Sequence, residues 1–169
     1  LIASDITPES LTLSWPKIID DGAVSKIVVQ MDGDTLAELS GDIESLEVTE
    51  LSPWVEYEFG VSGEDEAGNV SDSLTLKVQT SDNVAPSWPD DPQLSIHNVK
   101  AQSLELNWPE AGDDVAVSHY VVTVDGDNPL TVEVGLTSAT LTELTPSATY
   151  LFSVVAVDAA GNGSLALHI

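Results

Sequence analysis

Most of the chain consists of one sequence unit that occurs twice. When the residues from Leu11 onward are laid over those from Leu104 onward, the two segments align without a gap at an offset of 93 residues. Nearly half of the positions between Ser10 and Leu74 are then identical in the second copy. A unit of this length is typical of a small domain with its own hydrophobic core. The repeat therefore predicts two domains of the same fold.

Each copy is expected to consist of short β-strands separated by turns. Stretches of alternating apolar and polar residues, and one dense apolar run before the turn signal Asp-Gly-Asp, predict the strands. In the first copy these stretches are residues 11–15, 26–31, 45–51, 55–61 and 73–79, preceded by residues 1–6. Signals for helices are few. Short strands at this regular spacing, roughly seven per copy, are typical of a β-sandwich.

A proline-rich stretch, residues 81–93, lies between the copies. It contains Pro86, Pro89 and Pro92 among Ser, Asp and Asn residues. Because proline stiffens the backbone and removes hydrogen-bond donors, we interpret this stretch as a short, semi-rigid linker. The domains are thus predicted over residues 1–80 and 94–169, and the last strand of the second copy is expected to be truncated at its end.

The charge of the chain restricts its partners. Four Lys and Arg residues stand against 29 Asp and Glu residues, so the formal net charge is −25. Such a field repels nucleic acid and anionic lipid, and the sequence has no apolar run long enough to span a membrane, so we expect neither partner. The absence of cysteine excludes disulfides and thiol chemistry. Two explanations of the acidity stay open: adaptation to a saline medium and specific binding of Ca²⁺.

Catalysis is not expected. His97, His119 and His168 are scattered, without the spacing of a metal site. The sequence contains no nucleophile elbow and no phosphate-binding loop. Pairs of carboxylates are common in so acidic a chain, and a glycosidase would also need a cleft.

Several landmarks occur in both copies and resemble those of fibronectin type III domains. The core Trp of the second strand matches Trp15 and Trp108, and the aromatic residue of the third strand matches Tyr120, where the first copy has Ile27. The pattern Leu-x-Pro-x-x-x-Tyr ends at Tyr57 and again at Tyr150. The resemblance implies an all-β chain of two immunoglobulin-like, seven-stranded sandwiches in tandem. It also implies that each Tyr forms a tyrosine corner, with its hydroxyl bonded to backbone upstream. Because the chain contains no Arg, the integrin-binding Arg-Gly-Asp triplet of some members is absent.

One acidic loop is repeated as EDEAGN at 64–69 and VDAAGN at 157–162. Asp, Gly and Asn at these places are what a tight hairpin turn needs, and we favour that interpretation. The alternative is a Ca²⁺ site, because in the family's fold the pair Asp20–Asp21 or Asp113–Asp114 lies at the same end as this hairpin. The candidate ligands near the hairpins are then Asp20, Asp21, Asp65, Asp113, Asp114, Asp158 and Asn162. The tandem arrangement would add Asp32, Asp34 and Asp82 near the junction. No cofactor is otherwise expected.

Trp54 and Trp88 are separate from the two core tryptophans. We expect them to cover the junction between the domains and to set its angle. A platform for stacking carbohydrate is the rival interpretation. Asn69 and Asn162 each begin an Asn-x-Ser sequon, so these surface hairpins are also candidates for glycosylation, although both residues suit the turn.

Taken together, these features predict a non-catalytic structural spacer in a larger extracellular or cell-surface protein. A surface layer, a filament, an adhesin or a secreted polysaccharide-active enzyme would be a suitable parent. Its partners would be neighbouring domains of that parent chain. The alternative is an adhesive module that binds polysaccharide or another cell-surface protein through its exposed loops and aromatic residues.

Overall fold

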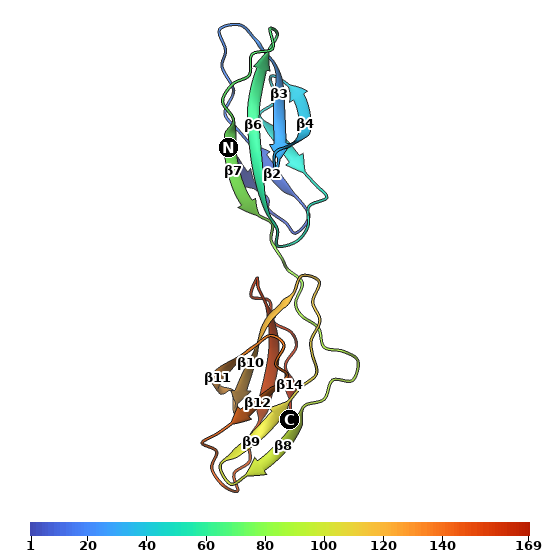
Figure 1. The fold of residues 1–169 in the computed structure, drawn as a ribbon, viewed down its shortest axis with the longest axis vertical. Coiled ribbons are helices and arrows are strands. Elements are labelled where there is room, and N and C mark those ends of the chain that lie inside the picture. Colours follow the sequence, from blue (N-terminus) through green and yellow to red (C-terminus); the bar gives the residue numbers. More distant parts are fainter. The chain divides into compact units, whose positions relative to one another are not determined.

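The computed structural model describes residues 1–169, and for residue 128 it describes the backbone alone. The chain divides into two compact units, residues 1–82 and 83–169, each shown as a set of arrows in Figure 1. The described residues form strands and turns and contain no helix, which confirms the predicted all-β class. Consequently, no described helix is long and apolar enough to cross a membrane.

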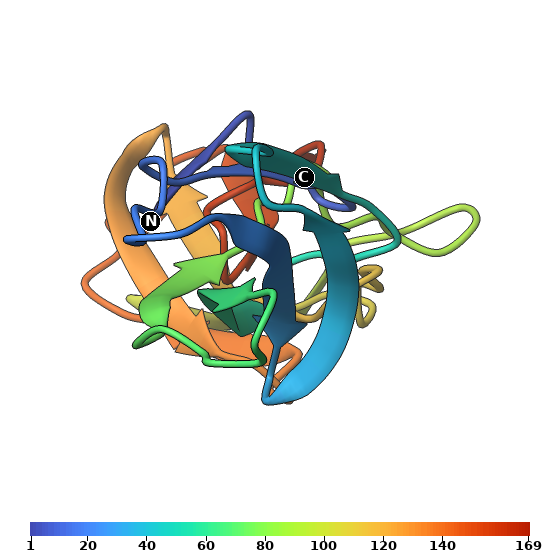
Figure 2. The same cartoon turned by 90° about the horizontal axis from the view of Figure 1, so that it is seen from above.

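The first unit is built from two antiparallel sheets. One sheet has the order β1-β2-β5, with β1 at Ile2–Ser4, β2 at Leu11–Ser14 and β5 at Ser45–Val48. The other has the order β4-β3-β6-β7, with β4 at Asp34–Ser40, β3 at Val24–Met31, β6 at Glu56–Asp65 and β7 at Leu74–Gln79. Strands twist because of backbone sterics, and the curl of β4 is visible in Figure 2.

The second unit repeats this arrangement. One sheet has the order β12-β9-β8, with β12 at Ser138–Leu141, β9 at Ser103–Asn107 and β8 at Ser95–Lys100. The other has the order β11-β10-β13-β14, with β11 at Asp127–Glu133, β10 at Val117–Val124, β13 at Phe152–Asp158 and β14 at Leu167–His168. Within the described residues each unit thus has the seven strands of the predicted sandwich.

Alternation along the strands builds a separate core in each unit. In β2, Leu11 and Leu13 are buried, and they lie in one cluster with Trp15, Phe59 and Val61. The second unit has its own cluster, which includes Leu106, Trp108, Tyr120, Phe152 and Val154. Because successive side chains of a strand point to opposite faces, the apolar positions of both sheets meet between them. Each copy therefore buries its own apolar face.

The repeat extends to the backbone conformation. Apart from Asp91 and Gly135, the residues with positive φ occur in pairs at the 93-residue offset. The pairs are Asp5 and Asn98, Asp32 and Asp125, Glu50 and Glu143, Trp54 and Ser147, Gly33 and Gly126, and Gly68 and Gly161. Positive φ is uncommon outside glycine, so this agreement is a stringent match between the copies. The two units share their turns as well as their strands.

The second unit begins earlier than the predicted boundary at residue 94. Ser87 and Gly112 exchange two backbone hydrogen bonds, at 2.8 and 2.9 Å. Trp88 packs against the core of the second unit. Residues 83–93, which we interpreted from their prolines as linker, are therefore assigned to the second unit, because backbone pairing and the burial of one aromatic ring hold them there.

The last strand of the second unit, β14, contains two residues, whereas β7 in the first unit contains six. Beyond β14, Ile169 and Phe152 exchange two backbone hydrogen bonds, at 3.0 and 3.1 Å. The edge of this sheet is thus paired as far as residue 169.

Truncation of an equivalent core leucine in each copy should destabilise one unit at a time. Leu13 and Leu106 are fully buried, so the substitutions Leu13→Ala and Leu106→Ala should each lower the free energy of unfolding by about 2–5 kcal/mol. Differential scanning calorimetry of the whole chain should show that each variant shifts a different transition. If both variants lowered one common transition by the same amount, the independence of the two cores would be refuted.

Candidate functional site

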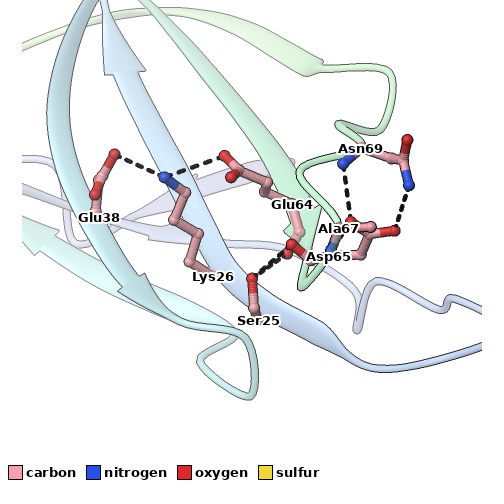
Figure 3. Close-up of polar contacts among 7 residues, drawn as sticks. All are labelled: Ser25, Lys26, Glu38, Glu64, Asp65, Ala67 and Asn69. Atoms are coloured by element: carbon pink, nitrogen blue, oxygen red, sulfur yellow. Dashed lines mark hydrogen bonds and ion pairs between the residues drawn. The ribbon is translucent and has the colours of Figure 1, made fainter.

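The repeated acidic loop of the first unit is organised around the Asp65 carboxylate. Its Oδ1 accepts hydrogen bonds from the backbone N–H groups of Ala67 and Asn69, both at 2.8 Å. Its Oδ2 accepts the side-chain amide of Asn69 at 2.7 Å. Figure 3 shows the two hydrogen bonds that Asn69 donates to the Asp65 carboxylate, one from its backbone N–H and one from its side-chain amide. Gly68 completes the turn with a φ of 87°. The aspartate therefore acts as the internal clamp of a tight turn.

The second unit has the same clamp. Asp158 Oδ1 accepts the backbone N–H of Asn162 at 2.8 Å, and Oδ2 accepts the Asn162 side-chain amide at 2.7 Å. Gly161 has a φ of 94°. Asp158 differs from its counterpart in burial, since its residue is only 2% exposed. The two sequon asparagines, Asn69 and Asn162, therefore have their side-chain amides engaged in the turns.

These contacts change the acid–base properties of Asp65. The side-chain hydrogen bond from Asn69, followed by the backbone N–H groups of Asn69, Ala67 and Gly68, lowers the pKa of the Asp65 carboxyl below its ordinary value of 3.8. Hydrogen bonds to a carboxylate favour its charged form. The turn is therefore stabilised by the ionised form of the residue.

A lysine bridges two carboxylates beside this loop. Lys26 Nζ lies 3.1 Å from Glu38 Oε1 and 3.1 Å from Glu64 Oε2, as the dashed lines in Figure 3 show. The hydrogen bond to Glu64 and then that to Glu38 raise the pKa of Lys26. The equivalent position in the second copy is His119. Since exposed ion pairs contribute little to stability, this contact mainly reduces local repulsion between acidic strands.

In the second unit, the structure brings together two of the predicted Ca²⁺ ligands. A carboxylate oxygen of Asp113 lies within 4.8 Å of one from Asp158. Asp113 Oδ2 accepts the N–H groups of Val115 and Ala116 at 3.2 and 2.9 Å. Its Oδ1 is buried and has no hydrogen-bond partner among the described residues. Asp114, the other member of the pair, is exposed.

The corresponding loop of the first unit is more open. Asp20 and Asp21 are exposed, and Asp20 Oδ2 accepts the N–H of Gly22 at 3.1 Å. Asp20, Asp65 and Asn69 line one groove of about 150 Å³. These residues share a surface, but each carboxylate already serves a turn in its own loop.

The remaining predicted ligands take other places. Asp32 Oδ1 accepts the N–H of Glu58 at 2.9 Å, and Asp125 Oδ1 accepts that of Leu151 at 2.8 Å in the second copy. Both are thus clamps between a hairpin turn and the neighbouring strand. Asp34 begins β4 with an exposed side chain, and Asp82 is the largely buried last residue of the first unit.

The tyrosines hold the corners of both sandwiches. Tyr57 Oη accepts the backbone N–H of Ser52 at 2.9 Å, and Tyr150 Oη accepts that of Thr145 at 2.6 Å. These bonds have the geometry of a tyrosine corner. A contact that the sequence did not reveal reinforces the first one: buried Thr80 donates its hydroxyl to Ser52 O at 2.7 Å. Its only sequence signal was a Thr at the end of a predicted strand.

The four tryptophans have different environments. Trp15 and Trp108 are both 5% exposed, and the indole N–H of Trp15 donates to Ile43 O at 3.0 Å. The indole N–H of Trp108 has no partner among the described residues. Trp54 is partly buried in the first unit, with a φ of 56°. Trp88 stacks on Tyr120 in the second unit, with ring centroids 6.0 Å apart.

Comparison with known proteins identifies the fold family. The family model described as "Fibronectin type III domain" matches residues 1–79 and 85–169. The chain belongs to the fibronectin type III family. This confirms the resemblance in the sequence, including the tandem arrangement. The fibronectin type III domain itself is non-catalytic. In the relatives described next, it is an accessory part of a larger enzyme.

The relatives include two bacterial polysaccharide-active enzymes. Chitinase A1 of Niallia circulans is 29% identical over 97% of this chain and 24% of its own length. Endoglucanase B of Cellulomonas fimi is 30% identical over 96% of this chain and 16% of its own length. The chain therefore spans a quarter or less of these two relatives. Among solved structures, a two-domain fibronectin type III segment of chicken tenascin is 20% identical, with a TM-score of 0.48 over 99% of this chain and 94% of that one.

Acidification should weaken the first unit through Asp65. Because the pKa of Asp65 is lower in the folded chain than its ordinary value, its stabilising effect is present above about pH 4 and is lost as the pH falls through the lowered folded value. The variant Asp65→Asn should therefore be less stable at pH 7 and should lose part of the acid dependence. Urea unfolding between pH 2 and pH 7, followed by tryptophan fluorescence, measures both effects.

The matched control is Glu66→Gln, which removes the same charge from the exposed neighbouring position. It should change stability much less than Asp65→Asn. Equal effects of the two variants across the pH range would assign the acid dependence to net charge and not to the turn.

Proposed function

We propose that this tandem acts as a non-catalytic spacer in a larger extracellular or cell-surface protein. The observation that carries the proposal is that each unit closes its own core and clamps its own turns, so neither depends on the other for a complete fold. The partners would be the neighbouring domains of the parent chain. Chitinase A1 and endoglucanase B match this chain over a minority of their own length. They support the proposal that the parent chain is a polysaccharide-active enzyme.

The charge distribution supports this role. A formal net charge of −25 keeps modules soluble and disfavours contact between like-charged surfaces. Within each unit, aspartates are bonded to backbone N–H groups of turns, as Asp65 and Asp158 are. The acidity is therefore compatible with a stable fold, while the outward charges keep neighbouring acidic modules apart.

A spacer should hold its two units at a defined distance. The chain has no cysteine, so single cysteines introduced at exposed Thr75 and Thr131 can carry spin labels. Pulsed dipolar spectroscopy should give a single narrow distance distribution, with a width within about twofold of a pair inside one unit, because the first unit ends at residue 82 and the second begins at residue 83, which leaves no free linker between them.

The control pair is Thr75→Cys with Ser45→Cys, both exposed in the first unit. A distribution between the units as broad as that of a flexible chain would contradict the spacer. It would favour instead an adhesive module whose units move independently on a partner surface.

We also propose that the acidic loops of the second unit take Ca²⁺. Asp113 and Asp158 place carboxylate oxygens within 4.8 Å of each other, and Asp113 Oδ1 is buried without a partner among the described residues. Two close carboxylates repel each other unless a proton or a cation lies between them. Oxygen ligands of this kind suit Ca²⁺, and a carboxylate oxygen that accepts one N–H retains a second lone pair. No cofactor is needed for the fold itself.

Calcium should raise the melting temperature of the second unit. At a free concentration one hundred times Kd, binding to the folded state adds about 2.7 kcal/mol to the free energy of unfolding. Calorimetry at fixed ionic strength, with Mg²⁺ as the reference ion, should show this shift in the wild type but not in Asp113→Asn/Asp114→Asn. The equivalent variant of the first unit, Asp20→Asn/Asp21→Asn, changes the net charge equally and should leave the shift intact. If Ca²⁺ and Mg²⁺ act alike, the acidity is a matter of general screening.

A further inference from the structure

The second unit carries a groove between residues 86–92 and residues 165–167. Its volume is about 520 Å³, within the usual range of ligand sites, and Trp88, Leu165 and Leu167 are among the residues that line it. In Figure 1 the segment before β8, drawn in yellow-green, loops out from the body of this unit. We propose that this groove binds an uncharged glycan chain whose sugars carry N-acetyl groups, as a β-1,4-linked N-acetylglucosamine chain does.

Trp88 forms a rigid aromatic wall in the groove. Its indole N–H donates to Leu165 O at 2.6 Å, and its ring stacks on that of Tyr120 at an angle of 18°. Tyr120 is itself fully buried, and its hydroxyl accepts the N–H of Ala111 at 3.2 Å. The ring is thus fixed before any ligand arrives, so binding does not cost the ordering of this side chain. The part of Trp88 that remains uncovered lines the groove and suits the C–H face of a pyranose ring.

The rest of the lining is apolar with an acidic rim. Exposed Pro89 and half-buried Pro92 present rigid rings, and Leu165 is 88% exposed, which is unusual for so large an apolar side chain. Asp90 and Asp91 are exposed at the same groove, and Gln93 donates its side-chain amide to Asp91 Oδ1 at 3.2 Å. The apolar part suits the methyl groups of acetamido substituents. The carboxylates are acceptors for sugar hydroxyls and amide N–H groups.

Charge decides between the classes of ligand. A chain with a formal net charge of −25 repels uronic-acid and sulfated polysaccharides. An uncharged sugar has no such penalty, and its hydroxyl and amide donors complement Asp90 and Asp91. A β-1,4-glucan supplies hydroxyls but lacks the methyl groups that would cover Leu165 and the prolines. The complementarity of the groove therefore favours the acetamido sugar over both the anionic glycans and the plain glucan.

The test is a titration of the whole chain with chitohexaose, followed by isothermal calorimetry and by NMR shifts of the Trp88 indole N–H. Saturable binding is expected, at least threefold tighter than that of cellohexaose, and polygalacturonate should not bind. Trp88→Phe keeps an aromatic ring against Tyr120 but loses the bond to Leu165, and it should weaken binding about tenfold. Asp90→Asn/Asp91→Asn keeps the size of both side chains and should weaken binding about threefold, because the charge-assisted acceptors are lost.

Trp54→Ala, in the first unit, is the control for a tryptophan outside the groove and should leave the affinity unchanged. Far-UV circular dichroism and the melting temperature show whether each variant is folded. The proposal is overturned if chitohexaose does not bind at millimolar concentration, if cellohexaose or polygalacturonate binds as tightly, or if folded Trp88→Phe binds like the wild type. These titrations do not measure the distance between the units, so they test the glycan site independently of the proposed spacer role.

Discussion

Electrostatic repulsion is the constraint around which this fold is arranged. With 29 acidic residues against four basic ones, lysines cannot neutralise the chain. The structure instead satisfies key carboxylates with backbone N–H groups at turns, where such donors are available without a partner strand. Asp65 and Asp158 each close a hairpin in this way, and Asp32 and Asp125 each tie a turn to the next strand. These four aspartates are therefore structural, whereas exposed carboxylates such as that of Glu66 set the surface charge.

The two copies share these turn bonds but differ in the hydrogen bonding of their core tryptophans. The indole N–H of Trp15 is bonded to Ile43 O, whereas that of Trp108 is buried without a partner among the described residues. An unsatisfied buried donor costs roughly 1–3 kcal/mol. In the same unit, Tyr120 replaces the Ile27 of the first copy and stacks on Trp88. The second core thus contains a stacked pair of aromatic rings, while the indole N–H of Trp108 lacks the hydrogen bond that Trp15 makes.

The sequence predicted the parts of the structure that depend on periodicity and on local turn chemistry. The alternation of apolar and polar residues predicted the strands of two sandwiches. The spacing from Leu51 to Tyr57 predicted the corner, where the tyrosine hydroxyl accepts a backbone N–H. The preference for a turn at residues 64–69 agrees with the clamp around Asp65. Because prolines are typical of linkers, composition predicted a linker over residues 81–93, whereas residues 83–93 belong to the second unit. Neither the Ser87–Gly112 pairing nor the ring stacking of Trp88 has a periodic signal, since both join residues distant in sequence.

This segment matters for function because it lines the groove of the second unit, together with Leu165 and Leu167. Duplication reproduces strands, corners and turn clamps, and these explain stability in both units equally. A property that belongs to one unit alone must come from what differs. At the groove the two copies differ within the repeat: Leu165 lies at the position of Asp72, and Tyr120, on which Trp88 stacks, lies at the position of Ile27. A spacer that gained a weak glycan contact in this way would keep its mechanical role, because the groove is formed on the outside of a core that is already closed by its own sheets.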